Sequence, residues 1–237
     1  MSANNKKSTM NSLMKINLQS IKSLFRHPET PGSLFLSFEG IEGSGKSTQI
    51  KEVEKFLKEK GFHVTILREP GGTQFGEKLR EAVLQSQTPL HPLAECHLFL
   101  ASRAQLLKEK ILPLLLIPGS VVILDRYLDS TLAYQGRARK LGFETVLTLH
   151  QFEPLNLLPH RTYFLDIEAN VSYERQKIRG NAKDYFESQK NEFHENLVDG
   201  YREVADIFQD RILKINAQRS MKEVTLEIIR DLEGFIP

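Results

Sequence analysis

The sequence has few features that would suit an oxidising compartment or a membrane. Cys96 is the only cysteine among the 237 residues, so no intrachain disulfide can form. The absence of an intrachain disulfide fits a reducing compartment or an indifferent one. No uninterrupted apolar run approaches the roughly 20 residues of a membrane-spanning helix. The N-terminal stretch MSANNKKSTMNSLMKINLQS contains lysines but no continuous apolar segment of a signal peptide. We therefore expect a cytoplasmic protein with no membrane partner.

The chain also has little net charge and no sign of guanine-specific switch machinery. A formal net charge of +2 is too small to argue for binding to nucleic acid or to an anionic membrane. With 40% apolar and 26% charged residues the composition is that of an ordinary soluble globular protein. No Asn-Lys-x-Asp stretch occurs, which disfavours a GTPase.

The chain divides into an N-terminal extension, residues 1–32, and one domain over 33–237. Residues 1 to about 12 are polar, and apolar residues recur only loosely at helical spacing over 14–25. A targeting or membrane-surface helix is one reading of this pattern. We favour an extension that is mostly disordered, because short, weak periodicities are common by chance.

Five short, β-branched apolar runs alternate with longer polar segments from residue 33 onward. The runs span 34–38, 63–67, 120–125, 161–167 and 211–216. Segments with helical periodicity lie between them, including 46–60 and 93–116, the latter expected to bend at Pro113. This alternation predicts an α/β fold with a parallel sheet covered by helices on both faces. Ligands of such folds bind at the carboxyl ends of the strands.

The stretch GIEGSGKS, residues 40–47, directly follows the first run and precedes a predicted helix. It fits the pattern G-x-x-x-x-G-K-[ST] of a phosphate-binding loop. Glycines let successive backbone N–H groups converge on phosphate oxygens, and the helix N-terminus adds its positive end. Lys46 is placed to reach the outer phosphates, and the Ser47 hydroxyl to ligate Mg²⁺. This motif predicts nucleotide binding but does not identify the acceptor.

Two further clusters follow the ends of other runs. Asp125 ends the third run, where a carboxylate in a phosphate-loop protein usually faces the metal or its water shell. Arg126 beside it offers a planar fork suited to a phosphate. The stretch REPGGT, residues 68–73, predicts a tight turn whose amides face a ligand.

Four motifs, FEGIEGSGKSTQ, REPGGT, FLASRAQ and DRYLDSTLAYQG, occur in an order and at separations that resemble bacterial thymidylate kinases. The resemblance covers nearly all of residues 34–237. It implies a P-loop nucleoside monophosphate kinase fold, with three layers, a five-stranded parallel sheet and a short helical lid. It also implies transfer of the γ-phosphoryl of ATP to dTMP with Mg²⁺ as cofactor. A homodimer formed through helices near 76–87 and 93–116 is implied as well.

The resemblance assigns residues to the two substrates. The ATP-binding residues are those of the phosphate loop: Gly40, Ile41, Glu42, Gly43, Ser44, Gly45, Lys46, Ser47 and Thr48. The dTMP-binding residues are Glu42, Arg68, Pro70, Phe99, Arg103, Arg126, Thr131, Tyr134 and Gln135. In the family pattern Phe99 stacks on thymine, Arg103 reaches its carbonyl edge and Arg126 contacts the monophosphate. Thr131 binds the base and Tyr134 packs near the deoxyribose.

The resemblance also implies where the charge-neutralising group comes from. One branch of the family has an arginine at the position of Gly43, whereas the bacterial branch supplies it from a lid, here about residues 174–188. Arg175 and Arg179 are four residues apart and share a helix face. With Lys46 and Arg126 they are the expected catalytic residues. Tyr185 is a departure, because many bacterial members have arginine at this position, which puts the activity of the lid in question.

Two alternatives to a thymidylate kinase remain at this level. One is a kinase for another small nucleotide or nucleoside, and the sequence does not separate dTMP from dUMP. The other is a nucleotide-binding sensor whose altered lid no longer completes the reaction. The presence of Lys46, Ser47, Asp125 and Arg126 argues against the sensor, and Tyr185 is its one support.

Overall fold

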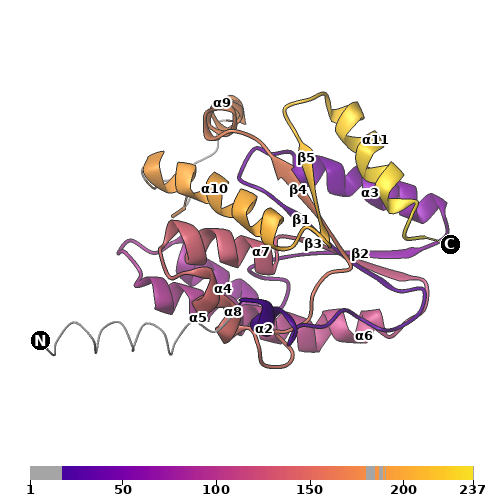
Figure 1. The fold of residues 1–237 in the computed structure, drawn as a ribbon, viewed down its shortest axis with the longest axis horizontal. Coiled ribbons are helices and arrows are strands. Elements are labelled where there is room, and N and C mark those ends of the chain that lie inside the picture. The colour runs from indigo at the N-terminus through magenta and orange to yellow at the C-terminus, as the bar shows by residue number, and fades with distance from the viewer. Residues whose placement is uncertain (1–17, 180–184, 187–188, 190, 237) are drawn as a thin grey trace, which may run out of the picture.

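The computed structural model describes residues 18–179, 185–186, 189 and 191–236. A five-stranded sheet forms its centre, with strand order β2-β3-β1-β4-β5 and every pair parallel (Figure 1). The strands are β1 Leu34–Glu39, β2 His63–Arg68, β3 Ser120–Asp125, β4 Arg161–Asp166 and β5 Ile212–Asn216. All five predicted runs form these strands, so the predicted fold class is confirmed.

Helices cover both faces of the sheet, as the alternating pattern predicts. On one face α3, Lys46–Glu59, packs beside α11, Met221–Leu232 (Figure 1). The other face and the site edge carry most of the remaining helices. These are α4 Gln74–Leu84, α5 Pro92–Leu106, α6 Leu112–Leu115, α7 Leu128–Thr131, α8 Phe143–Leu149, α9 Ala169–Arg179 and α10 Asn191–Ile207. Within the described residues, no helix is long and apolar enough to cross a bilayer.

The helix expected over 93–116 departs from α geometry before its proline. A π-helical turn, Leu107–Ile111, separates α5 from α6, and Pro113 lies in the first turn of α6. Proline has no N–H to donate to the carbonyl four residues earlier, and widened turns of this kind accommodate that loss. A second π-helical turn, Leu132–Ala138, carries Tyr134 and Gln135, which sequence periodicity gave no reason to expect.

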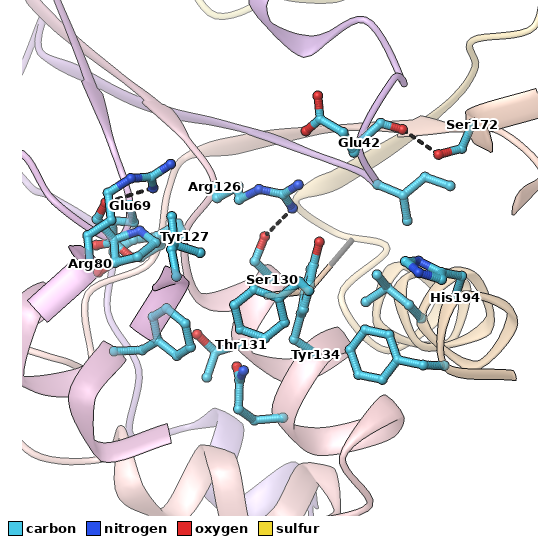
Figure 2. Close-up of a pocket in the computed structure, with 18 of the residues that line it drawn as sticks. Glu42, Glu69, Arg80, Arg126, Tyr127, Ser130, Thr131, Tyr134, Ser172 and His194 are labelled. Atoms are coloured by element: carbon cyan, nitrogen blue, oxygen red, sulfur yellow. Dashed lines mark hydrogen bonds between the residues drawn. The ribbon is translucent and has the colours of Figure 1, made fainter. Parts of the chain in front are cut away.

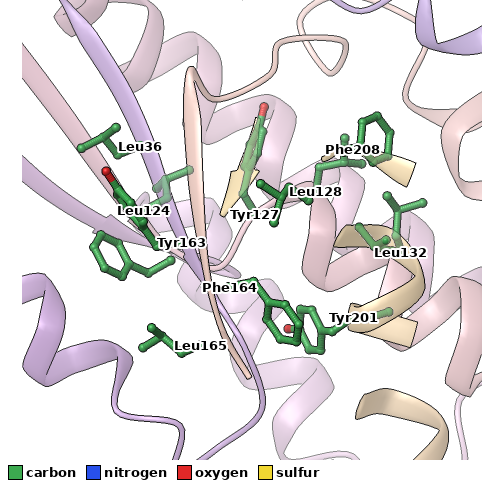
Figure 3. Packing of buried hydrophobic residues seen from close by; sticks show 14 of the residues in the cluster. Leu36, Leu124, Tyr127, Leu128, Leu132, Tyr163, Phe164, Leu165, Tyr201 and Phe208 are labelled. Carbon is green, nitrogen blue, oxygen red and sulfur yellow. The ribbon is translucent and has the colours of Figure 1, made fainter. Parts of the chain in front are cut away.

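The core reaches the functional edge of the sheet through an aromatic pair. Phe164 of β4 stacks on Tyr201 of α10 with ring centroids 5.3 Å apart (Figure 3). The Tyr201 hydroxyl then accepts a hydrogen bond from Arg126 Nη1 at 2.8 Å. Packing of apolar groups therefore fixes a hydroxyl that holds a charged residue at the carboxyl edge of the sheet.

Part of the N-terminal extension packs against the domain. Helix α2, Leu18–Lys22, lies against α8, and Ile21 is buried in the main core. The N–H of Arg26 donates to Asn156 O at 3.0 Å, and Arg26 O accepts from Leu158 N at 2.7 Å. The structure thus places residues 18–32 on the domain. The disorder expected for the first part of the extension falls on residues 1–17, outside the described residues.

Candidate active site

Two cavities meet at the carboxyl edge of the sheet, where the sequence predicts ligand binding. The aromatic cavity is lined by Phe99, Tyr134, Phe186 and Phe193 together with Arg103, Thr131 and Gln135. The polar cavity is lined by residues of the phosphate loop with Arg68 and Asp125. Four charged residues line both cavities: Glu42, Glu69, Arg80 and Arg126. A ligand that spans the two cavities therefore passes these charged groups.

The phosphate loop takes the conformation that its glycines permit. Gly40, Gly43 and Gly45 have φ angles of 137°, 75° and 99°, which other residues rarely adopt. A Cβ atom on Gly40 would lie 2.7 Å from Leu165 O, so the loop passes too close to β4 for a side chain. The loop leads directly into α3, and its amides lie at the positive end of that helix. This is an anion-binding geometry.

Lys46 lies at the base of the polar cavity and is held by its own loop. Its Nζ donates to Gly40 O at 2.9 Å and to Ile41 O at 3.2 Å. Burial, followed by the charge of Arg126, lowers the pKa of Lys46 to about 8. A phosphate group in the polar cavity would supply the negative charge that this buried ammonium requires.

Asp125 and Ser47 fit the expected magnesium site. Both line the polar cavity, and Asp125 is the last residue of β3. Asp125 Oδ1 is buried and accepts no hydrogen bond from the described residues, so one carboxylate oxygen is open to a metal or its water. The described residues contain no group of three or more His, Cys, Asp or Glu suited to a metal. One carboxylate and one hydroxyl suit Mg²⁺, which keeps several waters and binds substrate phosphates.

Arg126 lies where the two cavities join. Its Nη1 donates to Gly40 O at 3.0 Å and to the hydroxyl of Tyr201 at 2.8 Å. It also donates to the hydroxyl of Ser130 (Figure 2). The guanidinium carbon lies 5.3 Å from the centre of the Tyr134 ring. Its φ of 72° is a strained value for a residue with a side chain. The strained backbone and these contacts direct the guanidinium between the base-sized space and the phosphate loop.

A buried carboxylate supports Arg126 through Ser130. Glu39 ends β1, and its two oxygens accept from Tyr127 N at 2.7 Å and Ser130 Oγ at 2.6 Å. Burial and the nearby Asp129 carboxylate raise the pKa of Glu39 to about 8. Ser130 is thereby held in place to interact with Arg126.

Arg103 is enclosed rather than solvated on a helix surface. Its side chain is 3% exposed, and Nε and Nη2 bind Glu69 Oε2 at 2.7 and 2.5 Å. On the other side Nη1 lies 2.6 Å from His150 Nε2. Burial and the Arg103 charge lower the pKa of His150 to about 3, so its neutral ring accepts this hydrogen bond. Three contacts thus fix the guanidinium at the cavity wall.

The lid side of the aromatic cavity is closed by aromatic rings around Arg139. Phe186 packs edge-on against Tyr134, with centroids 5.2 Å apart. The Arg139 guanidinium lies 4.8 to 5.8 Å from the ring centres of Tyr185, Phe186 and Phe193. Tyr185, the departure from the bacterial pattern, accepts a hydrogen bond from Leu90 N at 3.1 Å. Its hydroxyl therefore fastens the end of the lid to the segment before α5.

The expected lid arginines are only partly described. Arg175 on α9 donates to Gly43 O at 3.0 Å and to Ala217 O at 3.1 Å, so it bridges the phosphate loop and the chain after β5. Arg179 is the last residue of α9, and its side chain lies outside the described part of the chain. Arg175 lies beside the polar cavity without lining it.

Most residues expected from the sequence gather here, and several others join them. Arg68 and Pro70 line one cavity each, and Ile41 lines the aromatic cavity; Gly40, Ser44 and Thr48 shape the loop without lining either. Sequence reasoning missed Glu69, Arg80 and His150. Arg80 lies on α4, twelve residues after Arg68, with no motif to mark it, and donates to Pro70 O at 3.1 Å. His150 directly follows α8 as its C-cap, in a segment that carries no motif at all.

Comparisons with known proteins identify the family of the chain. A sequence model of the family described as Thymidylate kinase matches residues 38–228. The thymidylate kinase of Caldanaerobacter subterraneus subsp. tengcongensis is 39% identical over 202 residues, covering 85% of this chain and 96% of that protein. The thymidylate kinase of Geobacillus sp. is 40% identical over 206 residues, covering 84% and 98%. A crystal structure of thymidylate kinase from Ehrlichia chaffeensis matches with a TM-score of 0.66 and 30% identity, covering 86% of this chain and 99% of that one.

Proposed function

The chain belongs to the thymidylate kinase family, and from that membership we propose that it transfers the γ-phosphoryl group of ATP to dTMP. The products are dTDP and ADP. The observation that carries the proposal is the meeting of an aromatic cavity and a phosphate loop at Arg126. A nucleotide base fits the first space and phosphates fit the second. The dTMP phosphate would then lie between them, beside Arg126.

In the reaction an oxygen of the dTMP phosphate attacks the γ-phosphorus of ATP. A new P–O bond forms while the bond from the γ-phosphorus to the bridging oxygen breaks, and ADP leaves with that electron pair. The protein contributes position and positive charge, because phosphoryl transfer needs little covalent chemistry from it. Lys46 and the loop amides bind the donor phosphates, and Arg126 binds the acceptor phosphate with Arg68 and Arg80 near it.

Magnesium would be held by Ser47 and, directly or through water, by Asp125. When bound, Mg²⁺ supplies charge neutralisation at the donor phosphates. These two side chains suit that role because the polar cavity offers oxygen atoms and no sulfur or imidazole ligand among its lining residues.

The lid arginines complete the neutralisation in this proposal. Arg175 already touches the loop at Gly43, the position where other members of the family carry an arginine in the loop itself. A shift of its guanidinium from Gly43 O toward the γ-phosphate, with Arg179 from the next turn, would place positive charge on the transferring group. Tyr185 takes no part in this, since its hydroxyl is engaged by Leu90 N.

The acceptor is recognised through its base and sugar. Phe99 offers a ring face for stacking, Arg103 a donor for the 4-carbonyl, and Gln135 and Thr131 further polar contacts. Tyr134 lies between the base space and Arg126, where it would pack against the deoxyribose. We further propose that the enzyme works in the cytoplasm as a homodimer. These last two points rest on the family alone.

The test is ADP formation by purified protein with ATP and Mg²⁺, comparing dTMP, dUMP, dCMP and thymidine as acceptors. The proposal expects a rate on dTMP at least tenfold above that on dCMP and thymidine, with equal amounts of dTDP and ADP. A preference for another acceptor would replace the substrate with that compound. Binding of ATP with no ADP formed on any acceptor would reject the kinase and leave a nucleotide sensor.

A further inference from the structure

Glu95 is a fully buried carboxylate directly behind the aromatic cavity. It lies on α5, does not line the cavity, and accepts a hydrogen bond from Gln135 Nε2 at 2.8 Å. Arg139 binds it as well: its Nε lies 3.3 Å from Oε1, the oxygen that accepts from Gln135, and its Nη2 forms an ion pair with Oε2 at 3.2 Å. Charge and hydrogen bonding therefore connect Glu95 to a residue of the cavity wall.

This contact decides which end of the Gln135 amide faces a ligand. An ionised carboxylate accepts hydrogen bonds and donates none, so the NH₂ group of Gln135 must point toward Glu95. The carbonyl Oε1 is the end that remains for the cavity, and no described residue donates to it. A side chain that would otherwise offer either a donor or an acceptor is thereby restricted to an acceptor.

Arg103 supplies the complementary donor. Of its five N–H groups, the bonds to Glu69 and His150 use one on each of the three nitrogens. One N–H therefore remains on Nη1 and one on Nη2, at a guanidinium that lines the cavity. The cavity wall then presents a fixed acceptor and a fixed donor.

We propose, on the basis of the function proposed above, that Glu95 is a positioning residue that makes the site select a pyrimidine with N3–H and a 4-carbonyl over cytosine. Thymine and uracil donate from N3 and accept at O4, which matches Gln135 Oε1 and the Arg103 donors. Cytosine accepts at N3 and carries an amino group at C4, so both contacts would be mismatched. Turning the amide around would correct one mismatch, and Glu95 prevents this turn.

The variant Glu95→Met tests this because it removes the acceptor that holds Gln135. Glu95→Gln would not, since its amide oxygen can keep the position of Oε1 and accept from both Gln135 and Arg139. Without that acceptor the Gln135 amide can turn and present NH₂ to the cavity. The turned amide suits N3 of dCMP and not N3–H of dTMP.

The experiment measures the dissociation constants of dTMP and dCMP by calorimetry, on the full chain without ATP. The matched control is Asp129→Asn, which neutralises an equally buried carboxylate that is paired to Arg211 at 2.6 Å and does not line the cavity. We expect the ratio of the dCMP constant to the dTMP constant to fall about tenfold or more in Glu95→Met. The ratio should stay within about twofold of the parent in Asp129→Asn.

An unchanged ratio in a folded Glu95→Met protein overturns the proposal, as does an equal fall in Asp129→Asn. If Glu95→Met does not fold, Glu95→Asp keeps the charge for Arg139 but withdraws the acceptor from Gln135. A smaller fall in the ratio is then expected, and no fall overturns the proposal. Binding needs no turnover, so failure of this inference is distinct from failure of the kinase assay.

Discussion

Arg103 and Lys46 are both buried cations at the same edge of the sheet, yet their surroundings differ. Arg103 is paired with Glu69 and held by His150, so the protein satisfies its charge before any ligand arrives. Among the described residues, the Lys46 ammonium donates hydrogen bonds to two carbonyl oxygens of its own loop and forms no ion pair, and burial lowers its pKa to about 8. The base-reading end of the site is therefore completed by the protein. At the phosphoryl-transfer end, Lys46 forms its ion pairs only when the phosphates of the ligands bind.

The largest effect should come from the lid. Replacing Arg175 and Arg179 together with methionine should lower kcat about 10³-fold or more, as loss of a comparable arginine finger does. Affinity for dTMP should change little, because Arg175 does not line the aromatic cavity. Steady-state kinetics and dTMP calorimetry measure the two quantities.

Lys177→Met is the control for that variant, since Lys177 lies on the same helix but pairs with Glu174 at 3.0 Å on the surface. It should keep activity within about twofold. A double arginine variant that retains normal kcat would mean that the charge on the transferring group is neutralised elsewhere.

Removing Lys46 should come next. We expect Lys46→Met to lower kcat/KM about 10²–10³-fold, through loss of one charged donor to the phosphates. The variant should also change how the free energy of unfolding depends on pH. The folded pKa of Lys46 is depressed, so the unfolded chain binds more protons and the parent gains stability as pH rises from about 8 to about 10.5.

The methionine variant should lack that gain. Denaturant unfolding of both proteins at pH 7.5 and pH 10 measures it. If the two stability curves run parallel over this range, burial does not lower the pKa of Lys46, and the contrast with Arg103 fails.

His150→Leu should have a smaller effect, confined to the acceptor end. It removes the acceptor from Arg103 Nη1, and we expect KM for dTMP to rise about tenfold with kcat changed less than threefold. His150→Gln can restore an acceptor and should recover most of the loss. Equal losses in both variants, or a fall in kcat alone, would show that His150 does not act through Arg103.

Glu39→Gln should have the smallest effect on turnover and a clear effect on pH dependence. The folded pKa of Glu39 is raised to about 8, so the folded protein binds more protons and loses stability as pH rises from about 4.5 to about 8. The glutamine variant should not lose this stability. Thermal melts of both proteins at pH 5.5 and pH 8.5 measure the difference, and identical pH dependence would contradict it.

The fold and the phosphate loop could be predicted from the sequence because both have local signals. Apolar runs mark strands, and a glycine loop followed by Lys46 marks a phosphate site. The predicted strand ranges agree with the observed ones to within about a residue. The motifs that resemble a known family predicted Phe99, Arg103 and Gln135 as site residues, and all three line one cavity.

The partners of those residues had no such signal. Glu95, His150 and Glu69 act through contacts with Gln135 and Arg103 across 34 to 47 positions of the chain. A buried histidine at the end of a helix looks like any other histidine in the sequence. The widened turn that carries Gln135 also changes which residues share a helix face, so periodicity would have misplaced it.

The most direct test of the contrast between the two ends is calorimetry of dTMP binding, without and with a non-hydrolysable ATP analogue and Mg²⁺. If the protein completes the base-reading end by itself, dTMP should bind in the absence of any donor nucleotide. Its dissociation constant should change by less than about tenfold, or 1.4 kcal/mol, when the analogue is added. Binding of dTMP that appears only after the analogue is bound would contradict the account, because the acceptor site would then be assembled by the donor.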